Sequence, residues 1–245
     1  MPDDPPFRPT LSRSWRLLRA FGVEQSDPDH FYGTLADDSV GQVRSYTPLD
    51  DRWVLDVGGG PGYFAAAFQA AGARYTALDA DLGEMSGRGH PEAGTVLGSG
   101  MELPFADDSF DVTFSSNVLE HVPDPWRMAD EMVRVTRPGG LVFLSYTLWW
   151  GPWGGHETSP WHYLGGGRAA RRYERRHGHR PKNVFGSSLF AVTAAAGLRW
   201  AQAQRRAVVV AFVPRYLPRW MWWVVRVAGL REVVTWNLAV VLRKR

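Results

Sequence analysis

The sequence predicts an α/β fold in which helices cover both faces of a mostly parallel β-sheet. First, short apolar, β-branched segments alternate with segments of helical character from residue 53 onward. Second, a glycine-rich turn, Gly58 to Gly62, directly follows the first apolar segment. Third, the next apolar segment ends in an acidic residue, Asp79. This order is typical of parallel sheets whose ligands bind at the carboxyl ends of the strands.

The predicted elements follow one another along the chain. Residues 1–50 are expected to form an N-terminal helical cap, with an arginine-rich amphipathic helix at Leu11 to Phe21 and a second helix capped by Asp27 or Asp29. Residues 51–245 form the main domain, because a chain of 245 residues supplies one full α/β core. The expected strands lie at 53–57, 74–79, 94–97, 110–115, 140–147, 198–207 and 236–242, and the expected helices at 63–71, 124–136 and 187–196.

Composition excludes several classes of site. The chain has no cysteine, which excludes disulfides, zinc–thiolate sites and mechanisms that need a cysteine nucleophile. The first residues, Met-Pro-Asp-Asp-Pro-Pro, are acidic and lack an apolar signal region, so we expect a cytoplasmic protein. The net charge of +3 hides an asymmetry, since residues 165–245 carry 15 Arg and 2 Lys against 2 Glu. Such a basic segment can attract an anionic partner or acidic lipid, or form a solvated helix flank.

The spacing of the glycines indicates the class of ligand. Gly58, Gly60 and Gly62 lie two positions apart, and a turn that passes its backbone against a ligand needs positive φ and no Cβ. The dinucleotide-binding pattern has a third glycine where this chain has Tyr63. This departure favours S-adenosylmethionine over a nicotinamide cofactor and speaks against a dehydrogenase. Asp79 follows in the position of an acid that accepts hydrogen bonds from ribose hydroxyls.

Further motifs follow in a fixed order: Gly98-Ser99-Gly100-Met101, Ser109-Phe110-Asp111-Val112, Asn117-Val-Leu-Glu-His121 and Arg137-Pro-Gly-Gly140. Together with the glycine turn they resemble the class I S-adenosylmethionine-dependent methyltransferases, most closely the branch of the ubiquinone and menaquinone methyltransferases. The resemblance extends from about Trp53 to Tyr146. It implies a Rossmann-like, seven-stranded sheet whose last strand is antiparallel.

The resemblance also implies which residues bind S-adenosylmethionine. Asp56 with Gly58, Gly59, Gly60 and Gly62 would hold the methionine end, and Asp79 the ribose. The turn formed by Ser99, Gly100 and Met101 would hold the adenine, and Asn117 lies at the same edge of the predicted sheet. The family commonly has an aspartate at the position of Ser99. A serine hydroxyl still accepts a hydrogen bond from the adenine amino group, so serine at this position is expected to change the affinity for the donor more than the identity of the ligand.

The segment after the fifth strand is the expected substrate wall. Residues 147–185 form a long loop rich in Gly, Trp and His, and long loops of this composition usually carry function. Its candidate catalytic residues are His156, Glu157, His162 and Tyr163, of which a histidine suits a general base near neutral pH. Each of them can instead be a loop-packing residue. Methyl transfer requires no metal, and the spacing from His156 to His162 is not a metal-binding pattern.

Three other segments bear on partners. Residues 213–232, an insertion between the last two strands, place Arg215, Arg219 and Arg226 on one side of a predicted helix rich in tryptophan. The segment suits peripheral membrane contact, or a helix that caps the substrate pocket or contacts a second copy. In the cap, His30, Phe31 and Tyr32 are expected either to close over the cofactor or to pack. Ser115-Ser116-Asn117-Val118 lacks the proline–aromatic clamp of enzymes that methylate nucleic-acid bases, so nucleic acid is not the expected substrate.

The sequence therefore predicts an enzyme that transfers a methyl group from S-adenosylmethionine to a small-molecule or lipid-like acceptor, with O-methylation ahead of C-methylation. The alternative is an S-adenosylmethionine-binding module without turnover that acts through a partner protein.

Overall fold

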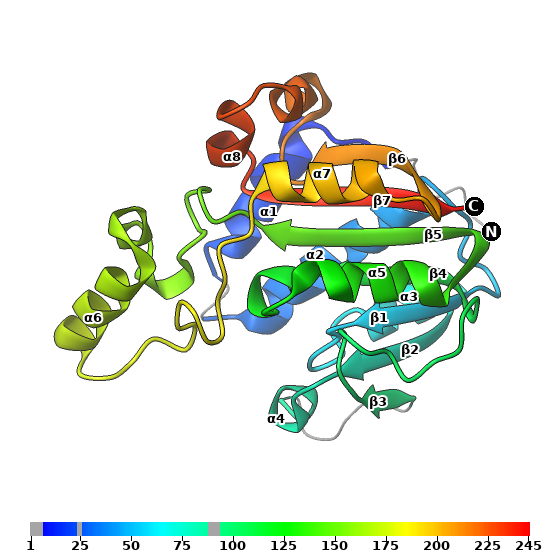
Figure 1. The fold of residues 1–245 in the computed structure, drawn as a ribbon, viewed down its shortest axis with the longest axis horizontal. Coiled ribbons are helices and arrows are strands. Elements are labelled where there is room, and N and C mark those ends of the chain that lie inside the picture. The colour runs from blue at the N-terminus through cyan, green and yellow to red at the C-terminus, as the bar shows by residue number, and fades with distance from the viewer. Residues whose placement is uncertain (1–6, 24–25, 88–93) are drawn as a thin grey trace.

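The computed structural model describes residues 7–23, 26–87 and 94–245. At its centre lies one seven-stranded sheet with the strand order β3-β2-β1-β4-β5-β7-β6 (Figure 1). Five strands pair in parallel: β1 (Trp53–Val57), β2 (Arg74–Asp79), β3 (Thr95–Leu97), β4 (Phe110–Ser116) and β5 (Thr136–Thr147). β7 (Asn237–Lys244) pairs antiparallel with both β5 and β6 (Ala207–Pro214). The predicted fold class is thus confirmed.

Helices cover both faces of the sheet because its strands are apolar on both sides. Along β5, Val142 and Leu144 belong to one buried cluster, and Phe143 between them belongs to the other. The first cluster lies under α5 (Pro125–Val135) and α7 (Ala194–Ala203), which are in front in Figure 1. The second lies under α2 (Pro28–Arg44) and α3 (Ala65–Ala70), on the far face. A continuous apolar run is expected for a strand buried on both faces.

The two N-terminal helices begin where the sequence predicts. α1 spans Leu11–Phe21, and the Asp27 side chain caps α2 by accepting a hydrogen bond from the backbone N–H of His30. A buried ion pair joins the helices, with 2.6 Å between Arg13 Nη2 and Asp38 Oδ2. Arg13 also donates to the backbone carbonyl of Arg215 at 2.9 Å. These bonds fix the cap to the segment that follows β6.

Two expected elements are wrong. The helix expected at 187–196 lies instead at Ala194–Ala203, and the strand expected at 198–207 begins only at Ala207. The Thr193 side chain starts α7 by accepting from the backbone N–H of Ala196. The Glu232 carboxylate, from the far end of the insertion, accepts from the first two backbone N–H groups of the helix, those of Ala194 and Ala195, at 2.7 Å each. Because this capping residue lies far from α7 along the chain, the local sequence does not indicate where the helix begins.

The loop after β5 contains more regular structure than expected. It leaves the sheet at the carboxyl end of β5 and forms η2 (His156–Thr158), η3 (Trp161–Leu164) and α6 (Gly166–His177), which project from the sheet in Figure 1. The basic residues from Arg168 onward lie mainly on the exposed surface of α6. The Arg172 guanidinium lies 3.8 Å from the centre of the Trp161 ring, which joins α6 to η3.

The insertion after β6 is not one amphipathic helix, so the predicted alignment of its three arginines is wrong. It forms a 3-10 helix, η4 (Arg219–Arg226), which follows Pro218, and a short helix, α8 (Leu230–Val234). Arg215 precedes η4 and is completely buried, while Arg219 and Arg226 are exposed. The two remaining short elements are α4 (Leu82–Met85) and η1 (Leu119–His121). Among the described residues, no helix combines the length and the apolar character that crossing a membrane requires.

Candidate active site

The glycine turn after β1 adopts the conformation that its sequence requires. Gly58, Gly60 and Gly62 all have positive φ, at 83°, 50° and 81°. A Cβ on Gly58 would lie 2.5 Å from the Val118 side chain, so only glycine fits there. This close approach packs the turn directly against the segment that leaves β4. The turn and that segment therefore form one edge of the site.

Asp79 connects the glycine turn to the end of β2. One carboxylate oxygen accepts from the backbone N–H of Gly60 at 2.9 Å, and the other accepts from the N–H of Asp81 at 3.0 Å. The side chain is partly exposed. Its carboxylate is held in place by the backbone and stays accessible to a ligand.

Asp56 lies beneath the turn and is 1% exposed. Burial raises the pKa of its carboxyl to about 7, a hydrogen bond from the Tyr75 hydroxyl at 2.6 Å opposes that rise, and the negative charge of Asp79 adds to it. The neighbouring Gly59 has no room for a side chain, since a Cβ would lie 2.9 Å from that of Ala77. Asp56 is thus a buried acid that titrates near neutral pH.

The segment after β3 reaches the same edge. The Ser99 hydroxyl accepts from the backbone N–H of Met101 at 3.2 Å, which closes a tight turn. A Cβ on Gly100 would lie 3.1 Å from the Val57 side chain, so this turn packs against the end of β1. The structure therefore places the expected adenine turn beside the strand that carries Asp56.

Asn117 ends β4 in the left-handed conformation, with a φ of 58°. Its side-chain oxygen accepts from the Asn237 amide at 2.6 Å, and the Tyr216 hydroxyl also bonds to its side chain. Next to it, the buried Arg215 guanidinium donates to the hydroxyls of Ser116 and Ser145 at 2.8 and 2.6 Å. These bonds tie the carboxyl ends of β4, β5 and the start of β7 to the insertion.

The cap reaches the glycine turn through one aromatic pair. The Tyr32 ring on α2 stacks on the Tyr63 ring, with centroids 4.5 Å apart and planes 16° apart. Phe31 is buried, and His30 is exposed. Of the three expected lid residues, Tyr32 is therefore the one in contact with the residue that follows the glycine turn.

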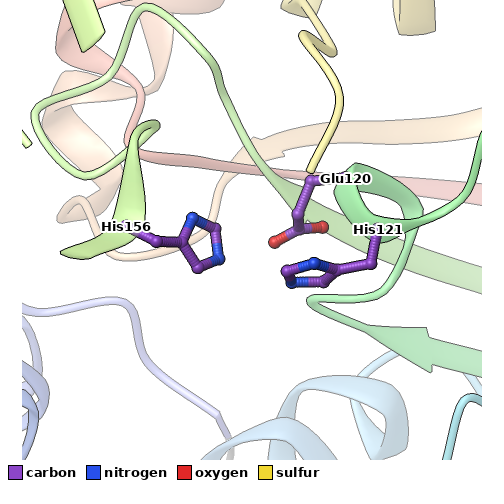
Figure 2. Close-up of side chains that lie close together, drawn as sticks. All are labelled: Glu120, His121 and His156. Atoms are coloured by element: carbon purple, nitrogen blue, oxygen red, sulfur yellow. The ribbon is translucent and has the colours of Figure 1, made fainter. Parts of the chain in front are cut away.

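Three polar side chains meet just beyond Val118. Figure 2 shows Glu120 and His121 from η1 facing His156 from η2. The His121 and His156 rings lie 5.0 Å apart at nearly a right angle. Burial lowers the pKa of His156, so its imidazole is neutral at physiological pH. A backbone hydrogen bond with Gly154 opposes that lowering. Within the described residues, Glu120 Oε2 is buried without a hydrogen-bond partner.

The other candidate catalytic residues lie elsewhere in the loop. His162 is buried against Trp149, and its Nδ1 lies 3.3 Å from the Ser159 hydroxyl. Tyr163 is 41% exposed and donates to the backbone carbonyl of Trp150, while the exposed Glu157 accepts from Asn183. These contacts hold the loop together. In the sequence, Glu120 and His121 stand out only as part of the motif Asn117 to His121, and only the fold brings them to His156.

The chain is similar to several known proteins. Residues 55–144 match the family model described as a methyltransferase domain. An uncharacterized methyltransferase of Mycolicibacterium gilvum is 59% identical over 246 residues, covering 96% of each chain. Another, from Mycobacterium leprae, is 55% identical over 248 residues, covering 97% of this chain and 91% of its own.

Two solved structures share the fold. An S-adenosylmethionine-dependent methyltransferase from Mesorhizobium loti has a TM-score of 0.57 at 19% identity, over 85% of this chain and 98% of its own. A second S-adenosylmethionine-dependent methyltransferase, from Methanosarcina mazei, has a TM-score of 0.53 at 20% identity, over 83% of this chain and 96% of its own.

Proposed function

The chain belongs to the class I S-adenosylmethionine-dependent methyltransferases, and we propose that it methylates a small-molecule or lipid-like acceptor, with O-methylation ahead of C-methylation. One observation supports this proposal. Gly58 packs against Val118, which directly precedes the short helix η1 that carries Glu120 and His121, and these two side chains lie close to His156. A methyl group delivered over the turn would meet its acceptor next to these three side chains.

The donor would lie across the carboxyl edge of β1, β2 and β3. In this proposal Asp56 and Gly58 to Gly62 hold the methionine end, Asp79 accepts from the ribose hydroxyls, and the turn Ser99 to Met101 holds the adenine. The hydrogen bonds of Asp79 to the backbone of Gly60 and Asp81 support its role, because they fix the carboxylate before the ligand arrives. Tyr32 on Tyr63 would help to exclude water.

S-adenosylmethionine, when bound, would supply a methyl group by in-line displacement, with its S–CH3 bond breaking as the O–CH3 bond forms and its sulfonium ending as a neutral thioether. The acceptor hydroxyl would lose its proton. A neutral imidazole can take that proton, and His156 is the candidate whose pKa burial lowers and whose ring faces Glu120 and His121 (Figure 2). Alignment and exclusion of water supply the rest of the rate enhancement. His162, Tyr163 and Glu157 are proposed to shape the wall around the acceptor.

Exposed apolar side chains near the cap and the insertion favour an apolar acceptor. The residue before α1's N-cap, Pro9, accepts a hydrogen bond of 2.7 Å from the Arg219 N–H at the start of η4. α1 exposes Leu11, Trp15 and Leu18, and η4 exposes Trp220 and Trp223. Exposed tryptophan beside arginine suits contact with an anionic membrane. The resemblance to ubiquinone and menaquinone methyltransferases also favours an acceptor with an apolar tail.

The test uses S-adenosylmethionine labelled with tritium in its methyl group. The protein is incubated with separate lipid and polar extracts of cells, alongside the Asp79→Ala and His156→Ala variants. Enzymatic O-methylation predicts label in an extractable product of the lipid extract, loss of label with Asp79→Ala, and slow transfer with His156→Ala. Binding of the donor without transfer to either extract would instead support a binding module that acts through a partner protein.

A further inference from the structure

We propose that Glu120, His121 and His156 together bind one divalent transition-metal ion beside the donor turn. One ligand atom from each of the three side chains lies within 4.8 Å of the other two. Figure 2 shows all three side chains pointing toward a common centre. In tetrahedral coordination with metal–ligand distances of about 2.1 Å, ligand atoms lie about 3.4 Å apart, so the side chains need to approach one another by at most about 1.4 Å.

The unused hydrogen-bonding capacity of the cluster supports a cation at its centre. Glu120 is 1% exposed, yet among the described residues its Oε2 has no hydrogen-bond partner. Leaving such a group unsatisfied costs free energy, and native proteins rarely tolerate it without a ligand, water or ion. The His156 nitrogen that faces Glu120 in Figure 2 is Nε2, so a metal ion at the centre would bind this carboxylate oxygen and the Nε2 lone pair.

Neighbouring groups hold two of the ligands in the orientation that a metal requires. His121 Nδ1 lies 2.8 Å from the Ser188 carbonyl, so this nitrogen carries the proton and Nε2 carries the free lone pair. The other Glu120 oxygen, Oε1, accepts from the backbone N–H of Thr147 at 3.1 Å. The backbone carbonyl of Glu120 accepts from Phe190 at 2.7 Å. The end of β5 and the segment 188–190 thus fix the carboxylate and one imidazole.

The donor set indicates the class of metal. Two imidazole nitrogens and one carboxylate oxygen suit Zn²⁺, Co²⁺, Mn²⁺ or Fe²⁺, whereas Ca²⁺ and Mg²⁺ prefer oxygen ligands. Three protein ligands leave coordination positions open for another molecule. In a role that rests on the proposed methyl transfer, an acceptor hydroxyl would occupy one of them. The cation would then lower the pKa of that hydroxyl, in place of proton removal by free His156.

The test measures metal binding directly. Protein freed of metal with EDTA is titrated with Zn²⁺ by calorimetry and with Co²⁺ by visible absorption. One ion should bind per chain. Glu120→Gln and His156→Ala should each weaken binding by more than about 100-fold, beyond the loss typical of an outer-shell partner. Glu120→Gln keeps an oxygen for the bond from Thr147, so it tests the ligand without removing that contact.

A control variant removes two other histidines. His177 and His179 are exposed, and their rings lie 6.2 Å apart, which makes them the obvious pair for adventitious binding. The double variant His177→Ala, His179→Ala should bind one ion as tightly as the wild type. Loss of binding in this variant, equal binding by Glu120→Gln and His156→Ala, or no binding by the wild type would overturn the proposal.

S-adenosylmethionine binding and methyl transfer are measured on the same samples. Retained donor binding by Glu120→Gln and His156→Ala would show that these variants fold. Methyl transfer by a protein that binds no metal would refute the metal site and leave the proposed function intact. Metal binding without methyl transfer to any acceptor would support the metal site and refute the proposed function.

Discussion

The backbone N–H of Gly60 donates a hydrogen bond of 2.9 Å to a carboxylate oxygen of Asp79. This bond joins the turn after β1 to the end of β2, two segments that the class I fold places side by side. The same carboxylate also accepts from the N–H of Asp81. Asp79 therefore shapes the turn, and in the proposed function it also presents oxygens to the donor's ribose.

Asp79→Ala should weaken S-adenosylmethionine binding by about 2 to 4 kcal/mol, because it removes charge-assisted hydrogen bonds to the ligand and leaves the Gly60 N–H without its acceptor. Asp79→Asn keeps one oxygen that can accept from the Gly60 N–H, so it should lose less binding free energy. Calorimetric titration of both variants measures the difference. An unchanged dissociation constant for Asp79→Ala would show that the ribose lies elsewhere.

Asp56 should make the protein less stable as the pH rises toward 8. Burial raises the pKa of this carboxyl to about 7 in the folded state, above its value of 3.8 in the unfolded chain. Its contribution is therefore fully present below about pH 4 and is lost as the pH rises through about 7. Asp56→Asn lacks this titration. The stability of the wild type relative to the variant should fall by about 3 kcal/mol between pH 5 and pH 8.

Denaturant unfolding of both proteins at several pH values checks this prediction. Tyr75→Phe is a useful third protein, because the Tyr75 hydroxyl bonds to Asp56 and lowers its pKa. This variant should shift the pH dependence of stability to higher pH. A wild type and an Asp56→Asn variant with parallel pH profiles would mean that Asp56 does not titrate near neutrality.

Glu232→Ala should lower the free energy of unfolding by about 1 to 2 kcal/mol. The reason is that the Glu232 carboxylate accepts from two N–H groups in the first turn of α7, where a negative charge is also favourable. The exposed Glu174 on α6 supplies a matched control, and Glu174→Ala should have less than about half that effect. Denaturant unfolding compares the two variants. Equal losses of unfolding free energy in the two variants would refute the capping role of Glu232.

Trp220→Ser combined with Trp223→Ser should reduce binding to anionic vesicles by at least about tenfold, because both side chains are more than half exposed on η4 beside Arg219 and Arg226. Co-sedimentation with phosphatidylglycerol vesicles measures the change. Trp53→Ser is the control, since Trp53 is 41% exposed at the opposite end of β1 from the glycine turn. Equal binding by all three proteins, or none by the wild type, would refute membrane contact through η4.

Local patterns predicted the part of the fold that carries the proposed donor site. β1 and β2 begin and end at the predicted residues, because each is a short apolar segment bounded by glycine or by an acid. α7 was misplaced because part of its N-terminal capping comes from Glu232, far along the chain. The cluster of Glu120, His121 and His156 was missed for the same reason. His156 reaches η1 only through the path of the loop after β5, which no local periodicity encodes.

The most direct test of the central claim is a crystal structure of the protein with S-adenosylhomocysteine, the product that the donor leaves behind. The account predicts the ribose hydroxyls on Asp79, the amino-acid end over Gly58 to Gly62, and the sulfur facing the side that holds His156. A ligand bound outside this edge of the sheet, or no ligand bound at millimolar concentration, would contradict it.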